Sequence, residues 1–470
     1  MDPLAEAVLA GAPPDRLAKE PLPTEYTAAH LRAEDVDVFG DAADRDVRRT
    51  LRVGPVPMPE LAVDEVLIAV MASSINYNTV WSATFEPVPT FTFLRRLGRQ
   101  GGSAARHDRP QHVVGSDAAG VIVRTGAGVR RWQVGEHVVV SCVQVDDQEP
   151  ATHADGMLGA EQRIWGFETN FGGLAHYAVV RASQLLPKPG HLTWEEAAST
   201  MLCAATSYRM LVSDRGARIK QGDIVLIWGA TGGLGAYAVQ LVKNAGGIAV
   251  GVVSTEEKSR RARALGCDVV INRADIGLDG DLADDPDATI EAGKRLGRII
   301  RAETGEDPHV VFDYIGRATF GISVFVVALS VALVVRRGGT VVTCGSSTGY
   351  QHRFDNRCWW MHLKRIVGSH AANLQEQAEC NRLFRLGHLV PVLSAVHPLA
   401  EVAEAARLVQ TNRHTGKVGV LCLAPRPGLG VTDQALRDRV GEDRLNLLRD
   451  AAPATPGPEP VVTGREGTGR

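Results

Sequence analysis

The feature that most constrains the fold is a glycine-rich turn between two apolar segments. Residues 224–228 (IVLIW) read as a buried strand, and residues 234–245 repeat apolar side chains at helical spacing. Another strand pattern at 248–253 and a helical stretch through Leu265 continue the alternation. This order predicts a doubly wound parallel sheet over about 206–384. The fold class is therefore α/β, with a Rossmann domain in the second half of the chain.

The turn itself, residues 229–235 (GATGGLG), favours a dinucleotide site. Its glycines permit a tight turn and let backbone N–H groups approach a pyrophosphate at the positive end of the following helix. A turn that only joins strand to helix is the alternative, and the position inside a strand–helix–strand unit makes it the weaker one. The predicted cofactor contacts are Gly229, Thr231, Gly232, Gly233, Leu234 and Gly235.

Residues after the second strand indicate which dinucleotide binds. An NAD site usually has an acid about 20 residues beyond the glycines, whereas this strand ends in Ser254. Ser254, Lys258 and Arg261 supply a hydroxyl and cations suited to a ribose 2′-phosphate, which favours NADPH. Glu256 and Glu257 compete with this interpretation, but in the first turn of a helix they complement its dipole. A solvated helix face is the alternative for Lys258 and Arg261.

The remaining chain adds a β-rich domain and a tail. A length of 470 residues exceeds one average domain, and residues 46–187 alternate short β-branched runs with glycines. We expect a catalytic domain over 1–205, completed by a returning strand within 385–424, and the cofactor domain over 206–384. Residues 425–470 are polar and rich in Pro and Gly, which predicts a tail with one weak helical pattern at 433–448 and disorder from 453.

Composition excludes several classes of partner. With 51 Lys and Arg against 54 Asp and Glu, the net charge is −3, so the chain lacks the cationic excess of a nucleic-acid-binding protein. The longest apolar run, 322–335, is too short to cross a bilayer and reads as buried core. The N-terminus shows no secretory signal, and the 7 cysteines are scattered without C-x-x-C spacing. We therefore expect a cytoplasmic protein with reduced thiols and no membrane contact.

No metal site is expected. A zinc-dependent dehydrogenase of this domain order needs a thiolate and a histidine as ligands, and the corresponding stretch here reads Gly115-Ser116-Asp117. Hydride chemistry is therefore expected to rely on hydrogen bonds and electrostatics without a Lewis acid.

Four segments carry a family resemblance: 73–81 (SSINYNTVW), 165–173 (WGFETNFGG), 183–189 (SQLLPKP) and 363–370 (LKRIVGSH). Over roughly residues 20–424 the chain resembles the crotonyl-CoA carboxylase/reductases, zinc-independent members of the medium-chain dehydrogenase/reductase superfamily. The resemblance implies a GroES-like catalytic domain beside the Rossmann domain, NADPH as cofactor, and a homo-oligomer, either dimer or tetramer. The implied reaction adds hydride to the β-carbon of a trans-2-enoyl-CoA. The resulting enolate attacks CO2 at the α-carbon and gives an alkylmalonyl-CoA, an extender unit for polyketide assembly.

The same resemblance implies roles for a small set of residues. Asn78 is similar to an amide that donates to a CO2 oxygen, and Glu168 and His370 resemble a pair that holds an ordered water against the other oxygen. Phe167 resembles the aromatic group that shields the pocket. Asn76 is the alternative to Asn78, because two residues along a strand put both side chains on one face. A structural histidine is the alternative for His370.

One departure from the family bears on the substrate. The family usually has Phe directly after the histidine, whereas this chain has Ala371. Loss of a ring from an acyl pocket leaves room for several methylenes, each worth about 0.8 kcal/mol when buried. Ala371 therefore predicts a substrate longer than crotonyl-CoA, from hexenoyl to octenoyl or branched. Refilling of that space by Trp359, Trp360 or Met361 is the alternative.

Two further features have no single interpretation. The apolar segment 326–335 lengthens the connection before the strand at 340–343 by about eight residues relative to the family. Five arginines are candidates for the coenzyme A phosphates, and a solvated cationic face explains them equally well. They are Arg95, Arg96, Arg99, Arg106 and Arg109.

Two other functions remain open. A plain NADPH-dependent enoyl-CoA or quinone reductase has the same fold and cofactor but protonates the enolate. A protein that only binds NADPH, or that has a structural role, is the second. The presence of Asn78, Glu168 and His370 together favours the reductive carboxylase over both.

Overall fold

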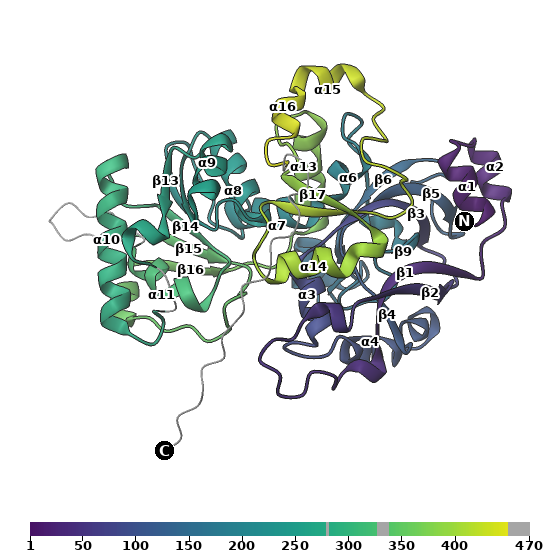
Figure 1. Ribbon diagram of the computed structural model, residues 1–470, viewed down its shortest axis with the longest axis horizontal. Coiled ribbons are helices and arrows are strands. Elements are labelled where there is room, and N and C mark those ends of the chain that lie inside the picture. Colours follow the sequence, from purple (N-terminus) through teal and green to yellow (C-terminus); the bar gives the residue numbers. More distant parts are fainter. Residues whose placement is uncertain (279–281, 327–337, 450–470) are drawn as a thin grey trace.

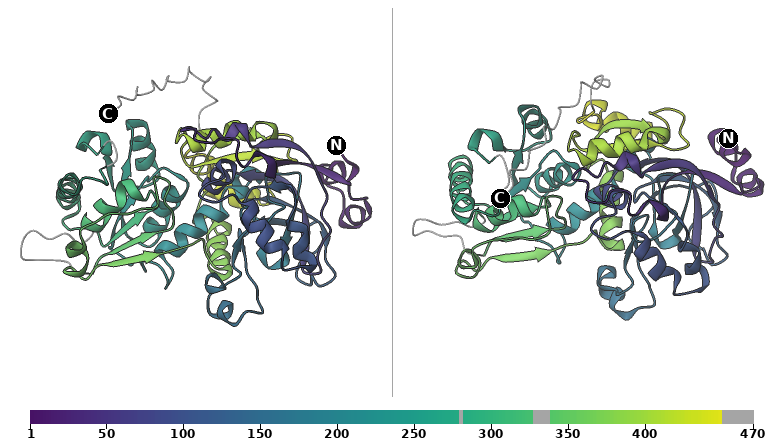
Figure 2. Two further views of the ribbon diagram at one scale, coloured as in Figure 1. Left: turned by 90° about the horizontal axis from the view of Figure 1, so that it is seen from below. Right: turned by 60° about the horizontal axis from the view of Figure 1, so that its bottom comes forward.

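The computed structural model describes residues 1–278, 282–326 and 338–449, which form two α/β lobes (Figure 1). The lobes lie side by side in each view (Figure 2), and α7 (Met201–Leu211) lies where they meet. The N-terminal helices α1 (Pro3–Leu9) and α2 (Pro14–Lys19) pack on the side of the catalytic lobe that faces away from the cofactor lobe.

The cofactor lobe has the predicted doubly wound topology. Its six strands are parallel in the order β13-β12-β11-β14-β15-β16. Every residue of the central strand β11 (Ile224–Trp228) is buried, as its unbroken apolar run predicts for a strand covered on both faces. The other strands are β12 (Ile248–Val253), β13 (Val269–Asn272), β14 (Val310–Asp313), β15 (Thr340–Thr343) and β16 (Arg365–Gly368).

Alternate residues of β11 enter two separate apolar cores. Val225 and Ile227 pack in the core that includes α8 (Gly233–Asn244) and α9 (Glu256–Ala264). Leu226 and Trp228 pack in the core that includes α10 (Pro286–Thr304) and α11 (Arg317–Val326). On the first side, α13 (Leu374–Arg385) packs against α7.

The catalytic lobe is built on a mixed sheet of seven strands. The path runs β10-β6-β5-β3-β18-β17, with β9 also pairing with β3. Its centre is β3 (Glu65–Ser74), which is buried along its whole length. The others are β5 (Ala119–Thr125), β6 (His137–Val140), β9 (Tyr177–Arg181), β10 (Leu185–Pro187), β17 (Leu393–Pro398) and β18 (Lys417–Leu421). A three-stranded sheet flanks it, formed by β2 (Arg52–Pro57), β1 (Glu25–Arg32) and β4 (Gln111–Val113).

The returning strands join the two lobes at the glycine turn. β18 pairs antiparallel with β3, so that Gly419 lies opposite Ser74. Just before β18, Gly416 forms an isolated bridge with Gly232, and its N–H donates to Thr231 O at 2.6 Å. The turn at the start of α8 therefore lies directly against the catalytic sheet.

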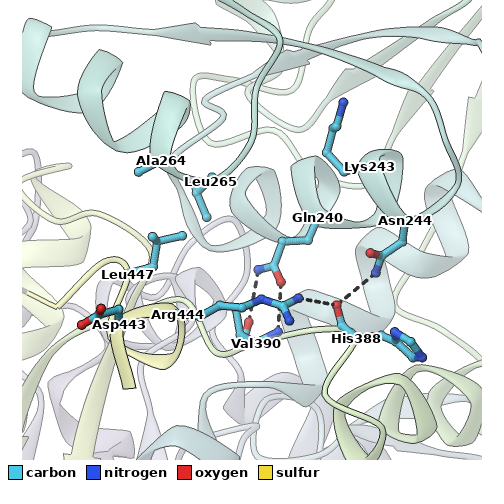
Figure 3. A pocket seen from close by; sticks show the side chains of 10 residues that line it. All are labelled: Gln240, Lys243, Asn244, Ala264, Leu265, His388, Val390, Asp443, Arg444 and Leu447. Atoms are coloured by element: carbon cyan, nitrogen blue, oxygen red, sulfur yellow. Dashed lines mark hydrogen bonds between the residues drawn. The ribbon is translucent and has the colours of Figure 1, made fainter. Parts of the chain in front are cut away.

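Residues 425–449 pack on the body of the protein and form α15 (Gln434–Val440) and α16 (Glu442–Leu445). Arg437 binds Glu196 through an Nη–Oε2 contact of 2.8 Å and donates to His191 O at 2.9 Å. A pocket of about 430 Å³ lies between α8, the end of α9 and α16 (Figure 3). There Arg444 and Asn244 both donate to His388 O at 3.2 Å.

Two predictions concern segments that lie wholly or partly outside the described residues. The expected disorder from residue 453 is one of them, since the description ends at 449. The added apolar segment at 326–335 is the other, because the description stops at Val326, the last residue of α11. Within the described ranges, no helix is both long enough and apolar enough to span a membrane.

Candidate active site

The glycine turn exposes the N-terminus of α8 for an anionic group. Gly232 caps the helix without a side-chain hydrogen bond, so the first N–H groups of α8 have no side-chain acceptor from the cap. Gly229 has a φ of 60°, and a Cβ on Gly235 would collide with Gly229 O. A pyrophosphate supplies the acceptors that such a helix start lacks. The residues present therefore fit a dinucleotide.

Tyr314 completes the turn, and the sequence patterns did not indicate it. It follows β14, and its hydroxyl donates to Gly229 O at 2.8 Å. A Cβ on Gly232 would collide with the same hydroxyl, so this glycine is needed for close packing as well as for the turn. On the other side, Leu234 O accepts a hydrogen bond of 2.9 Å from Ser207 on α7. The turn is thus held on two sides, by the residue after β14 and by α7.

Two cations, Lys258 and Arg273, and a neutral histidine, His414, lie near the predicted 2′-phosphate position at the end of β12. The pKa of Lys258 is lowered, first by burial and then by the charge of Arg273. Burial also lowers the pKa of His414 to about 4, and Lys258 contributes to that shift. Val253 of β12 lies opposite Asn272 of β13 in the sheet, so Ser254 and Arg273 leave it side by side, and Lys258 lies within electrostatic range of Arg273 and of His414. Arg273 and His414 were not found from the sequence, because they follow β13 and precede β18, far from the glycine turn.

Arg261 serves a different contact in this structure. It lies on α9 with Lys258, but its guanidinium donates to Thr415 Oγ1 at 3.0 Å and to Leu448 O at 2.8 Å. It also forms an ion pair of 2.9 Å with Glu257, one of the two acids that compete with the NADPH interpretation. Arg261 thereby ties the C-terminal segment to the cofactor lobe, while its proposed role toward the phosphate stays a prediction.

Replacing Lys258 by Ala is expected to raise KM for NADPH by roughly 10- to 100-fold, because a charge-assisted hydrogen bond to phosphate is lost. KM for NADH should stay within about twofold, since that cofactor lacks the 2′-phosphate. The matched control is Arg260→Ala, which removes an exposed cation from the same helix. Steady-state kinetics with both cofactors measure the effect. Equal losses for NADPH and NADH in Lys258→Ala would contradict the assignment.

Asn78 lies in the first turn of α3 (Tyr77–Thr84). Its Nδ2 donates to Ser116 Oγ at 2.8 Å. Its Oδ1 is buried and has no hydrogen-bond partner among the described residues. A buried amide oxygen that receives no hydrogen bond is costly unless a ligand or a water donates to it.

Asn76 is engaged entirely within the protein. It caps α3, its Nδ2 donates to Asp117 Oδ2 at 2.7 Å, and its Oδ1 accepts from the Lys417 ammonium. Asp117 and Lys417 form a buried ion pair of 3.1 Å. The premise that Asn76 and Asn78 share a strand face is wrong: β3 ends at Ser74 and the chain turns into a helix, where residues two apart diverge. The two residues differ at the amide oxygen, which accepts from Lys417 in Asn76 and has no partner among the described residues in Asn78, whereas each Nδ2 donates one hydrogen bond.

Phe167 and Glu168 follow the short strand β8 (Arg163–Ile164). Glu168 Oε2 accepts from the N–H of Ile164 at 2.8 Å, which fixes the carboxylate over its own turn. The ring of Phe167 lies 6.0 Å from that of Phe93 on α4 (Phe91–Gly98). A Cβ on Gly166 would collide with Gly115 O, so this turn lies against the residue next to Ser116.

His370 reaches this turn from the other lobe, directly after β16. His370 is an exposed residue, but the protein around its ring partly removes water from it. This desolvation is the main cause that lowers its pKa below 6.5. The charge of Glu168 opposes that shift and the charge of Arg209 adds to it, so His370 lies within electrostatic range of both groups. The imidazole is therefore neutral at neutral pH.

Ala371 is buried and has a φ of 42°. It lies in a small apolar core with Cys142, Val143, Val145 and Ile164, against which Phe167 packs. The structure thus brings together Phe167, Glu168, His370 and Ala371, and links them to Asn78 through the contact between residues 115 and 166.

Comparison with known proteins identifies the family. Residues 62–190 match the alcohol dehydrogenase GroES-like domain, and residues 233–386 match a family described as zinc-binding dehydrogenase. Crotonyl-CoA reductase of Streptomyces collinus is 49% identical over 91% of this chain and 94% of its own length. Crotonyl-CoA carboxylase/reductase of Cereibacter sphaeroides is 40% identical over 81% of this chain and 86% of its own. The chain belongs to the crotonyl-CoA carboxylase/reductase family.

A solved member of this family is similar over nearly the whole chain. The structure of the 2-octenoyl-CoA carboxylase reductase CinF with NADP and 2-octenoyl-CoA is 65% identical, with a TM-score of 0.91 over 95% of this chain and 98% of that one. The predicted family, α/β fold class and enzyme class are confirmed. The predicted NADP-type cofactor is confirmed for the family by this complex and by AntE with NADP.

The zinc-binding name of the second matched family raises the question of ligands. Among the described residues, no group of three or more His, Cys, Asp and Glu side chains is arranged to hold a metal. Within the 115–117 stretch, Asp117 is paired with Lys417 instead.

The five candidate arginines fall into two groups. Arg106 pairs with Glu65, and Arg109 donates to Pro57 O at 3.1 Å, with both guanidinium groups over the ring of Phe171. These two hold the lobe together. The other three line a surface pocket beside Phe93 on α4, and they are Arg95, Arg96 and Arg99.

Proposed function

We propose that the protein catalyses NADPH-dependent reductive carboxylation of a medium-chain trans-2-enoyl-CoA to an alkylmalonyl-CoA. The observation that carries the proposal is a polar set, Asn78, Glu168 and His370, placed around an apolar core that includes Ala371. The similarity to the 2-octenoyl-CoA carboxylase reductase CinF supports the same reaction class. The product is of the kind that polyketide assembly uses as an extender unit.

When bound, NADPH supplies the hydride that adds to the β-carbon of the thioester. The chain holds the pyrophosphate on the open N-terminus of α8 and surrounds the 2′-phosphate with Ser254, Lys258, Arg273 and His414. Tyr314 fixes the turn so that its N–H groups keep their direction.

The polar side chains direct the enolate toward CO2. The electron pair of the Cα=C bond forms the new Cα–carboxyl bond, while an oxygen of CO2 gains negative charge. Asn78 donates an N–H to that oxygen, and Glu168 with neutral His370 holds a water that donates to the other. Phe167 and Phe93 exclude bulk water, which would protonate the enolate.

The acyl pocket is proposed to admit a chain of about six to eight carbons, because Ala371 replaces a ring with a methyl group. Three side chains named above as able to refill this space lie elsewhere. Trp359, Trp360 and Met361 are exposed by 38%, 60% and 50% respectively, and they are not in the core around Ala371. For coenzyme A phosphates, the arginines that line the surface pocket are the candidates, Arg95, Arg96 and Arg99, of which Arg96 also lies 3.9 Å from the Glu161 carboxylate.

A homo-oligomer is proposed through the edge of the cofactor sheet. β16 is the last strand of the sheet, so its outer backbone groups have no partner strand among the described residues. Exposed apolar side chains precede it, with Trp360 at 60% and Leu363 at 64%. A cytoplasmic location is proposed because the 7 cysteines are free thiols, which persist in a reducing compartment.

The proposal is tested by incubating the protein with NADPH and 2-octenoyl-CoA, crotonyl-CoA or a quinone, with bicarbonate and carbonic anhydrase present. We expect the highest kcat/KM with 2-octenoyl-CoA and a carboxylated product by mass spectrometry. Saturated octanoyl-CoA as the only product, or a preference for the quinone, would identify a plain reductase. No NADPH oxidation with any substrate would leave only a binding or structural role.

The fraction of carboxylated product is expected to stay constant above about pH 7 and to fall as the pH drops through the pKa of His370. That pKa is lowered from 6.5, so the ring stays neutral to a lower pH than an ordinary histidine. A neutral ring can both donate and accept a hydrogen bond. The product ratio is measured against pH at a fixed concentration of dissolved CO2. His370→Asn, which does not titrate, should give a flat profile. A midpoint above 6.5 in the unaltered protein would contradict this account.

A further inference from the structure

A buried ionic network connects the two segments that carry the water-holding pair. Arg209 on α7 is 5% exposed and donates from Nη2 to Asp155 Oδ2 at 2.6 Å. Its Nη1 donates to Glu376 Oε2 at 2.7 Å. Asn373 Nδ2 closes the network with a bond of 3.2 Å to Asp155 Oδ1. One guanidinium therefore joins three parts of the chain that are far apart in sequence.

Each carboxylate lies close in sequence to one half of the proposed pair. Asp155 lies in the segment that connects β7 (Val143–Gln144) to β8. The turn after β8 carries Phe167 and Glu168. Asp155 also accepts from the N–H of Met157 at 3.1 Å, which fixes the excursion's own turn.

The second carboxylate fixes the start of α13. Asn373 Oδ1 accepts from Glu376 N at 2.8 Å, and Glu376 Oε2 accepts from Asn373 N at 2.9 Å, which is a capping box. His370 and Ala371 immediately precede this cap. The position of the cap therefore sets where the imidazole and the acyl-pocket methyl group lie.

We infer that Arg209 and Asn373 are positioning residues for the carboxylation step, because their network with Asp155 and Glu376 holds the Glu168 turn and the His370 segment in register. This rests on the proposed reductive carboxylation. A buried pair in which both partners are multiply hydrogen-bonded specifies one arrangement of its segments, even where it adds little stability. Hydride transfer, which depends on the glycine turn, does not require this register.

The network bears on His370 through charge as well as position. The titratable and charged groups that face His370 are Glu168 and Arg209. Those that face Arg209 are Asp155 and Glu376, with Arg215 at 3.6 Å from Asp155 on the exposed side. Arg209→Met removes the guanidinium that neutralises two buried carboxylates, so this variant is prone to unfold and is a poor test.

Asn373→Ser is the sharper variant. Serine is a good helix cap, so it keeps the bond from Glu376 N, but it is too short to reach Asp155. Asn373→Ala loses both contacts. The control is Arg215→Ala, which removes a side chain that is 55% exposed and leaves each bond of Arg209 intact.

The experiment measures carboxylated and saturated products from 2-octenoyl-CoA, together with kcat for NADPH oxidation and the melting temperature. In both Asn373 variants we expect the ratio of carboxylated to saturated product to fall roughly 3- to 10-fold, with kcat within about twofold of the unaltered protein. Arg215→Ala should keep the original ratio.

Two results would overturn the inference. The first is an unchanged ratio in both Asn373 variants. The second is restoration of the original ratio by Ser but not by Ala, which would show that Asn373 acts only as a helix cap. Failure of the unaltered protein to form any carboxylated product would instead refute the proposed function itself. The two failures are thus distinguishable.

Discussion

Replacing Glu168 by Gln is expected to turn the enzyme into one that mainly reduces its substrate. Gln keeps the acceptor for the N–H of Ile164, so the turn after β8 survives, but the negative charge that holds the water is lost. Hydrogen bonds to charged groups contribute about 1.5–3 kcal/mol, so the ratio of carboxylated to saturated product should fall roughly 10- to 100-fold. NADPH oxidation should persist, because hydride transfer uses neither the Glu168 carboxylate nor the water that it holds.

Asn78→Ala is expected to shift the product in the same direction and by a similar factor, since it removes the amide donor but leaves Ser116 in place. The matched control for Glu168→Gln is Glu161→Gln. It makes the same charge change at an acid that lies two residues before β8 and pairs with Arg163. Product ratios are read by mass spectrometry of acyl-CoAs at saturating CO2. An unchanged ratio in both Glu168→Gln and Asn78→Ala would remove these residues from the CO2 site.

Replacing Ala371 by Phe is expected to reverse the chain-length preference. The side chain is buried against Phe167, so an added ring occupies the space proposed for the distal acyl carbons. Octenoyl and crotonyl chains differ by four carbons, which at about 0.8 kcal/mol each amount to roughly 3 kcal/mol, or a change of about 100-fold in the ratio of their kcat/KM values.

Ala371→Gly is the control for this substitution. The residue has a φ of 42°, which Gly adopts freely and a bulky side chain does not, so the melting temperature of both variants is measured alongside. Gly adds no volume and should keep the preference for long chains. If Ala371→Phe is folded and still prefers 2-octenoyl-CoA by the original factor, then Ala371 does not line the acyl pocket.

The cofactor domain was predictable because its signals are local. An unbroken apolar run gives β11, the glycines give the turn, and helical spacing gives α8, all within residues 224–245. Asn78, Glu168 and His370 came from motif resemblance, since nothing in composition or spacing places these three positions together. The structure adds that the charge of Glu168 acts on His370 from the other lobe.

The contacts that were missed all join distant parts of the chain. Lys258 and Arg261 lie on one helix and were expected to act together, yet Arg261 binds Leu448 from a segment whose packing no local pattern predicts. Tyr314 and Arg209 lie in no recognisable motif. Their hydrogen-bond partners Gly229 and Asp155 lie 85 and 54 residues away in the sequence. The shared strand face expected for Asn76 and Asn78 was wrong because β3 ends at Ser74 and a helix begins at Tyr77.

The central claim is that the enolate is captured by CO2 and not by a proton. The most direct measurement is the amount of labelled carbon fixed per NADPH oxidised, with purified protein, 2-octenoyl-CoA, labelled bicarbonate and carbonic anhydrase. The account predicts a ratio close to one at saturating CO2, and formation of octanoyl-CoA only when CO2 is removed. NADPH oxidation at full rate with almost no label fixed would contradict it.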